Sequence, residues 1–309
     1  MTSTARTVLP TDLVALVSWD GRVYSNEAMT RDRVGTQASP HPLEAALDQW
    51  FSFATGRHTW ISVKGATLRG LVSARKRGSK LAWEVDCLID AAEDDRGVLM
   101  SLLDRMTAAA GKSGALKVFL RLPCDSYSVR TVERCGFTAY ARERVYRRLG
   151  AATESYQAPG GLRRRAKGDA YPLFQLYNRA VPGEVRRVEA STLAEWTAAQ
   201  ETLGRTSQYV LEVDGRITGA VRIATDGEVG RFDAVYEDDM RPLVDAALAK
   251  CANRAAVHAI VPEYQPALAS LLEERGFEAC EEYELLSRRT VRPVKVSKAV
   301  PAVVQTTFG

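Results

Sequence analysis

Apolar and polar residues alternate along residues 58–89, HTWISVKGATLRGLVSARKRGSKLAWEVDCLI, with turn-forming residues between the runs. Successive side chains of a strand point to opposite faces, so this pattern predicts an antiparallel meander of strands. Gly65, Gly70 and the pair Gly78-Ser79 are the expected breaks between strands. The final run, WEVDCLI, becomes apolar on both faces, which is typical of a strand inside a sheet.

After the meander the apolar spacing becomes that of a helix. Leu99, Leu102, Leu103 and Met106 form one apolar stripe in VLMSLLDRMTAAAGKSG. A buried strand is then expected at residues 115–123, followed by a helix that ends at Gly136 and a last strand, TAYARERVYRRL.

Two helices are expected ahead of the meander. Thr11-Asp12 supplies a cap for LVALVSWD, and the polar stretch EAMTRDR continues this helix. Pro40 and Pro42 then punctuate the chain before a second helix at Leu43–Ala54.

The same order of elements returns after residues 151–161, AATESYQAPGG, whose composition is that of a linker. Two helices, a hairpin turned on Asp214-Gly215, and an alternation of strand and helix are expected in turn. VERCGFTAY in the first half and LEERGFEAC in the second mark the same helix-to-strand corner. Repetition of a whole domain is the simplest explanation. We therefore expect an α/β fold with a mixed (α+β) sheet, as domains at residues 1–150 and 162–309.

The length and charge fit this organisation. A chain of 309 residues exceeds the about 100 to 150 residues of a usual domain, so two domains are expected. The net charge of +4 is too small to predict a nucleic-acid partner. Basic runs at residues 142–148, 163–165 and 288–298 are expected to be solvated strand ends, with an anion- or RNA-binding patch as the alternative.

Cysteine and histidine usage predicts no metal. The five cysteines form no C-x-x-C pair, and the three histidines lie far apart. Unpaired cysteines together with an N-terminal stretch, MTSTARTVLPTDL, that lacks a signal-peptide pattern predict a cytoplasmic protein. No apolar run approaches the length of a membrane helix, so no membrane partner is expected, whereas a homodimer stays open.

The repeated order, ending each time in a helix, Gly-Phe and an edge strand, resembles the GNAT family of acyl-CoA-dependent N-acetyltransferases. SVRTVERCGFTAYARERVYRR and ALASLLEERGFEACEEYELLSRR carry the resemblance most clearly. It covers nearly the whole chain and implies a tandem-GNAT protein with one domain in each half. In this family two parallel strands diverge and hold the pantetheine arm of acyl-CoA, and a glycine loop at the next helix holds the pyrophosphate.

The resemblance makes the first half the better acetyl-CoA site, with acetyl-CoA as a substrate. There the loop corresponds to DDRGVL, and the expected binding residues are Leu88, Ile89, Arg96, Gly97 and Val98. A helix N-terminus offers free N–H groups to a phosphate. In the second half the corresponding stretch, YEDDMRPLV, has no glycine and three acidic residues, so that half is expected to be degenerate.

The family's catalytic tyrosine, four residues before the glycine of Gly-Phe, is replaced by Val132 and Leu272. Glu84 as a base and Tyr127 as an acid are the candidates that remain. The alternative for Glu84 is an ion pair with Arg75 or Arg77.

Three functions follow as hypotheses. The first is an acyltransferase that modifies an unidentified small-molecule amine or peptide. The second is a non-catalytic tandem-GNAT protein that binds a ligand or partner. The third is a tRNA-linked transferase.

Overall fold

The computed structural model describes residues 5–7, 25–36, 57–64, 67–92, 95–150 and 161–290. The helix expected after Thr11, the one at Leu43–Ala54, most of the linker and the basic tail after Thr290 lie outside these residues. The segment EAMTRDR is described, and its expected helix is wrong. Residues 25–30 run without regular structure into a short 3-10 turn at Arg31–Arg33.

The first half contains six strands and two helices among its described residues. In chain order they are β1 (Arg6–Thr7), β2 (His58–Lys64), β3 (Thr67–Lys76), β4 (Ala82–Asp90), α3 (Arg96–Lys112), β5 (Lys117–Pro123), α4 (Val129–Arg134) and β6 (Thr138–Leu149). The predicted meander, helix, buried strand and last strand are therefore confirmed.

The second half repeats this order. It comprises β7 (Leu162–Arg164), α5 (Ala170–Ala180), α6 (Gly183–Glu189), α7 (Leu193–Ala199), β8 (Thr206–Val213), β9 (Arg216–Asp226), β10 (Val229–Tyr236), α8 (Arg241–Lys250), β11 (Ala256–Pro262), α9 (Pro266–Glu274) and β12 (Glu278–Arg289). The short strand β7 and the short helix α6 were not predicted from the sequence pattern.

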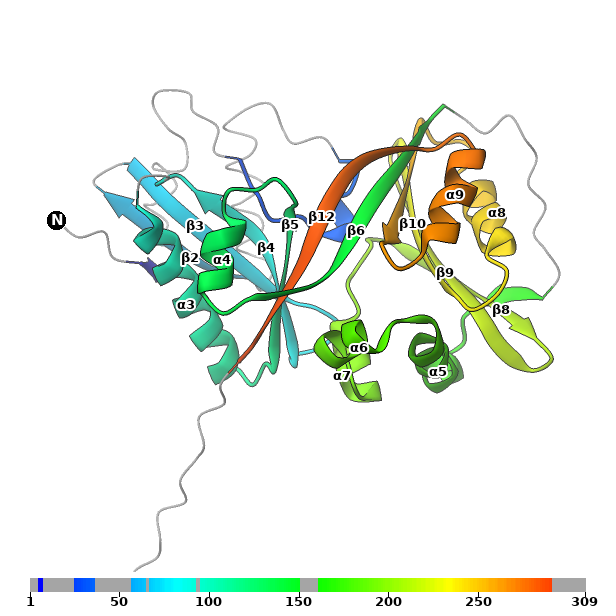
Figure 1. Ribbon diagram of the computed structural model, residues 1–309, viewed down its shortest axis with the longest axis horizontal. Coiled ribbons are helices and arrows are strands. Elements are labelled where there is room, and N and C mark those ends of the chain that lie inside the picture. The colour runs from blue at the N-terminus through cyan, green and yellow to red at the C-terminus, as the bar shows by residue number, and fades with distance from the viewer. Residues whose placement is uncertain are drawn as a thin grey trace, which may run out of the picture.

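All twelve strands form one continuous sheet in the order β1-β2-β3-β4-β5-β12-β6-β11-β10-β9-β8-β7. Each half sends its last strand into the other half. β12 pairs antiparallel with β5, where Leu286 faces Leu120, and β6 pairs antiparallel with β11, where Tyr146 faces Ala259. β6 and β12 cross the middle of the molecule side by side (Figure 1). The expectation that they are edge strands is wrong, because each has a neighbour on both sides.

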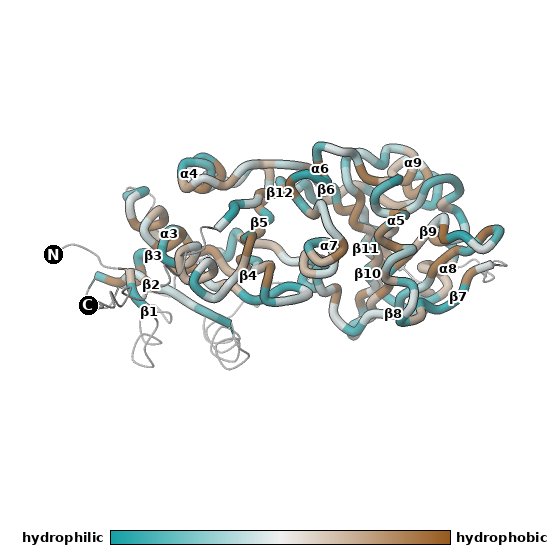
Figure 2. Tube along the Cα trace, turned by 90° about the horizontal axis from the view of Figure 1, so that it is seen from below, coloured by the Kyte–Doolittle hydropathy of each residue, from teal (hydrophilic) through white to brown (hydrophobic). Residues whose placement is uncertain are grey.

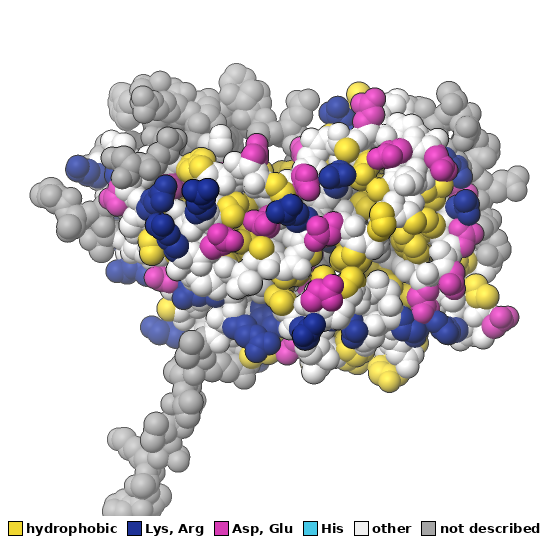
Figure 3. Space-filling model, in the orientation of Figure 1, with side chains coloured by type: hydrophobic (Ala, Val, Ile, Leu, Met, Phe, Trp, Pro, Cys, Tyr) yellow, Lys and Arg dark blue, Asp and Glu magenta, His cyan; other side chains and the backbone are white. Residues whose placement is uncertain are grey.

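Helices cover the sheet unevenly. α3 and α4 pack on the first half, and their apolar core includes Trp83, Leu102 and Val132. α8 and α9 pack on one face of the second half, whereas α5, α6 and α7 lie together on the opposite face, towards the middle of the molecule (Figures 1 and 2). Charged side chains of both signs are interspersed over the face seen in Figure 3.

Three glycines explain local details. Gly136 and Gly276 have φ of 80° and 77°, the left-handed conformation predicted for the two Gly-Phe corners. Gly70 was expected to break the meander, but it lies inside β3. A Cβ atom there would lie 3.0 Å from Cδ1 of Leu102, so this glycine admits α3 to the sheet.

Candidate functional site

The parallel strands β4 and β5 pair only from Ala82–Glu84 to Lys117–Phe119 and then diverge. The chain's own residues 25–30 fill the gap. The Glu27 amide donates to the Leu88 carbonyl on β4 at 2.9 Å, and the Met29 amide donates to the Arg121 carbonyl on β5 at 3.0 Å. The Asn26 side chain adds two bonds, accepting from the Leu88 amide at 2.8 Å and donating to the Asp86 carbonyl at 3.1 Å.

These contacts occupy both backbone groups of Leu88, one of the expected acetyl-CoA contacts. The side chains of Leu88, Ile89 and Val98 are buried. At the start of α3 the Asp95 carboxylate accepts from the Gly97 amide at 3.2 Å, so the protein itself caps that amide. Arg96 is exposed beside it. The structure thus places a protein segment and a carboxylate where the family resemblance implies the pantetheine and the pyrophosphate.

The two catalytic candidates, Glu84 and Tyr127, lie in different environments. Glu84 is 2% exposed and lies 2.5 Å from Arg75 and 3.2 Å from Arg77, which confirms the ion pairs offered as the alternative. Burial, followed by the nearby Glu201 carboxylate, raises the pKa of Glu84. Tyr127 is 56% exposed and donates from its hydroxyl to the Asp90 carbonyl at 2.9 Å. Glu84 lines the main cavity, whereas Tyr127 is not among the residues around it.

In the second half, no described backbone segment fills the gap between the corresponding strands. β10 and β11 pair from Val229–Asp233 to Ala256–Ile260 and then diverge. Past Asp233, on the edge of β10 that faces β11, the Gln265 side-chain amide donates to the Ala234 carbonyl at 3.3 Å. Gln265 is buried and its Oε1 has no partner among the described residues.

The helix that follows β10 is closed to a phosphate in the family's manner. The Asp239 carboxylate accepts from the Arg241 amide at 3.0 Å, and Pro242 in the first turn has no N–H to offer. Acidic residues near this terminus would also repel a phosphate, as expected from the sequence.

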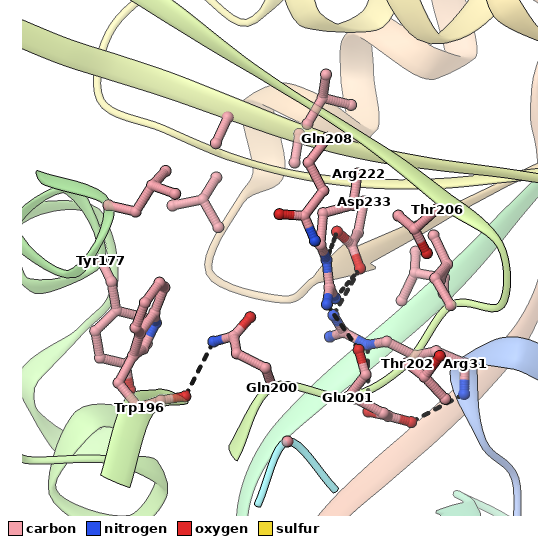
Figure 4. A pocket seen from close by; sticks show the side chains of 18 of the residues that line it. Arg31, Tyr177, Trp196, Gln200, Glu201, Thr202, Thr206, Gln208, Arg222 and Asp233 are labelled. Carbon is pink, nitrogen blue, oxygen red and sulfur yellow. Dashed lines mark hydrogen bonds and ion pairs between the residues drawn. The ribbon is translucent and has the colours of Figure 1, made fainter. Parts of the chain in front are cut away.

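A cavity of about 470 Å³ adjoins the open gap. It lies between α5 and α7 on one side and strands β8, β9 and β10 on the other, and Ala234, Val235 and Ile260 from the diverging strands line it. Figure 4 shows Tyr177 and Trp196 on one side of it and Arg222 and Asp233 opposite. Tyr264 lies in the turn after β11 and completes the wall next to the gap.

A charged network adjoins the cavity, and six of its ten members line it. Among the described residues, five arginines pair with five carboxylates. They are Arg31, Arg75, Arg77, Arg121 and Arg222 with Asp32, Glu84, Glu143, Glu201 and Asp233.

Arg31 and Arg121 connect the elements of this network. The Arg31 guanidinium bonds to Glu143 on β6 and reaches Asp233 on β10 at 2.7 Å. Arg121 holds Glu201 through two bonds of 2.6 and 2.9 Å. Arg31 directly follows the segment that fills the first gap, so the same stretch of chain closes one half and contacts the site of the other (Figure 4).

The network sets the protonation of its acids. Burial raises the pKa of Glu201, but Arg121 and Arg77 outweigh burial and hold this pKa well below its ordinary value. Asp233 behaves alike, since Arg222 and Arg31 lower its pKa more than burial raises it. Both carboxylates are therefore ionised at neutral pH.

Sequence reasoning missed most of these residues. Arg31 lay in a stretch expected to be helical, and Glu143 lay in a strand expected at an edge. Glu201 follows α7 in a segment without periodic pattern. The sequence did indicate one part of the network, the ion pairs of Glu84 with Arg75 and Arg77.

Comparisons with known proteins agree with this architecture. No protein-family model matches the sequence, and no curated protein matches it. Among solved structures, a GCN5-related N-acetyltransferase from Sphaerobacter thermophilus superposes with a TM-score of 0.53 at 16% identity, covering 94% of this chain and 96% of that one. A tandem GNAT protein from the clavulanic acid biosynthesis pathway gives 0.51 at 13% identity, covering 95% and 100%. The chain has the tandem GNAT fold. At these identities the comparison shows the GNAT fold alone.

No helix within the described ranges is both long enough and apolar enough to span a bilayer.

Proposed function

We propose that the protein is an acyl-CoA-dependent N-acyltransferase that works in its second half. The observation that carries the proposal is the contrast between the two gaps of the GNAT fold. Residues 25–30 fill the β4/β5 gap, whereas the β10/β11 gap opens beside a cavity that could hold an acceptor. This proposal differs from the expectation based on Gly97, which placed acetyl-CoA in the first half.

The pantetheine arm would lie against the free backbone edge of β10 beyond Asp233, where Gln265 now contacts the Ala234 carbonyl. Acyl-CoA supplies the acyl group as a thioester. An ammonium in the cavity would first lose one proton to solvent. The neutral amine would then form the new N–C bond while the thioester C–S bond breaks, and the second proton would go to the departing CoA thiolate to give free CoA. The cavity walls would hold the amine in place beside the thioester.

The phosphates of the donor would gain little from the helix termini. Asp95 and Asp239 each accept from an amide of the first turn, so the usual donors are in use. We therefore expect pantetheine recognition to supply most of the donor affinity. The same capping favours the second candidate, a non-catalytic protein, if the donor does not bind.

Calorimetric titration with acetyl-CoA tests the proposal. We expect heat of binding with the wild type and with Gly97→Glu, which alters only the exposed start of α3. Heat should vanish with Val235→Trp, which fills the cavity beside the second gap. S-acetyl-pantetheine should bind within about tenfold of acetyl-CoA, a difference of about 1.4 kcal/mol.

Absence of heat with both donors would overturn the proposal and leave the non-catalytic function. Loss in Gly97→Glu with retention in Val235→Trp would move the site to the first half. Circular dichroism spectra of both variants establish that they are folded.

A further inference from the structure

Glu189, the last residue of α6, is held at the cavity from two directions. The Lys117 ammonium on β5 donates to the Glu189 carbonyl oxygen at 3.1 Å, which fixes the end of the helix. The Tyr177 hydroxyl on α5 donates to the Glu189 carboxylate at 3.0 Å. Both Glu189 and Tyr177 line the cavity, so this carboxylate is positioned and not merely exposed there.

Unlike the carboxylates of the charged network, Glu189 has no arginine paired with it among the described residues. The five arginines and five carboxylates of the network pair with one another. Within the described ranges, Glu189 lies in no ion pair, and its described side-chain partner is a neutral hydroxyl. Burial raises the pKa of Glu189 by more than the Tyr177 hydroxyl and the charges of Arg77 and Arg31, neither of which forms an ion pair with it, lower that pKa. A cation in the cavity would remove this energetic penalty.

Tyr177, which bonds to the carboxylate, belongs to a cluster of aromatic rings. The Tyr177 and Trp196 rings line the cavity with centroids 6.3 Å apart, and Phe174 packs against both at 6.2 and 6.0 Å. The rings of Tyr177 and Trp196 lie on the same side of the cavity (Figure 4). Aromatic faces attract cations within about 6 Å of their centroids. A carboxylate beside such faces is suited to an ammonium group.

We propose that Glu189, Tyr177 and Trp196 form an ammonium-binding site for a small primary amine with an apolar body, the acceptor of the proposed function. The remaining walls fit such a body, since Leu173, Leu176 and Val210 line the same cavity. A volume of about 470 Å³ lies within the range of roughly 300–1,000 Å³ of small-molecule sites, so a free amine fits better than a folded polymer.

The role of this amine as the acyl acceptor rests on the proposed function. Its binding can be tested without an acyl donor. Calorimetry with 2-phenylethylamine as the probe, at neutral pH and without acetyl-CoA, measures the site alone. The matched variants are Glu189→Gln and Glu184→Gln, because both glutamates lie on α6 and Glu184 is exposed. Trp196→Leu probes the aromatic wall.

We expect the wild type and Glu184→Gln to bind the amine equally, Glu189→Gln to lose at least about tenfold in affinity, and Trp196→Leu to lose several-fold. The neutral analogue 2-phenylethanol should bind at least about tenfold more weakly than the amine. Equal binding of alcohol and amine, or an unchanged affinity in Glu189→Gln, overturns the proposal, and so does a wild type that binds no amine. Such a failure together with intact acetyl-CoA binding would leave the proposed function standing.

Discussion

Replacing Arg31 by Met tests whether the charged network joins the two halves. Arg31 reaches Glu143, Glu201 and Asp233, and its removal leaves four arginines facing five carboxylates, four of which are buried. Removing one member of a buried ion pair costs about 3–5 kcal/mol, because the remaining charge is left uncompensated. At about 2–4 °C per kcal/mol, the melting temperature should fall by at least about 6 °C.

Urea unfolding at pH 7, followed by circular dichroism, measures this loss. Arg163→Met is the control, because Arg163 also has two acidic partners, Asp169 and Glu212, but its side chain is 40% exposed. Exposed pairs contribute about 1 kcal/mol or less.

The double variant Arg31→Met/Glu143→Gln restores the balance of charge in the network. It should therefore lose less stability than the sum of the two single variants, by about 0.5–3 kcal/mol. The reasoning is refuted if Arg31→Met costs no more than Arg163→Met, or if the two losses add within about 0.5 kcal/mol.

Three further predictions concern the acid at the cavity, the segment in the first gap and the repeated corner. Because burial raises the pKa of Glu189, the folded state binds its proton more tightly than the unfolded state, and this group lowers stability as pH rises from about 4.3 through the folded pKa. Glu189→Gln should thus melt above the wild type at pH 7 and with it near pH 4, while a difference that ignores pH would contradict the assignment. Asn26→Ala removes two hydrogen bonds to β4 and should cost about 1–3 kcal/mol, with faster amide exchange at Leu88; unchanged exchange would show that the segment does not hold the gap. Gly276→Ala meets no atom within 4 Å, so thermal unfolding should show only the left-handed penalty of about 1–2 kcal/mol, and a larger loss would indicate a steric cause.

The sequence specified those elements whose signals are local. Asp214 and Gly215 both have positive φ, which suits the tight hairpin predicted there. The glycines of the two Gly-Phe corners also have the positive φ that was predicted for them. A strand's alternation of side chains specifies its buried face but not its neighbour. The pattern of β6 and β12 fits either half, and their exchange could not be deduced from it.

The site was harder to predict than the fold. The charged network joins Arg31, Arg121, Glu143, Glu201 and Asp233, which are brought together by the exchange and by residues 25–30. The sequence correctly predicted that Arg96 and Gly97 lie at the N-terminus of a helix, α3. It gave no sign that Asp95 caps that terminus or that Asn26 bonds in the nearby gap. Contacts of this kind depend on tertiary structure, which single-sequence patterns do not encode.

The exchange of β6 and β12 also imposes an order on synthesis. Ribosomes deliver the first half early, but β5 receives its second neighbour only when β12, the last described element, emerges. Until then β5 has an unpaired edge at which a nascent chain can associate with another. Native pairing of β5 must therefore wait until residues 278–289 have been synthesised, and such distant closure slows folding. A nascent chain stalled before β12 should bind chaperones, whereas one released after β12 can close its own sheet.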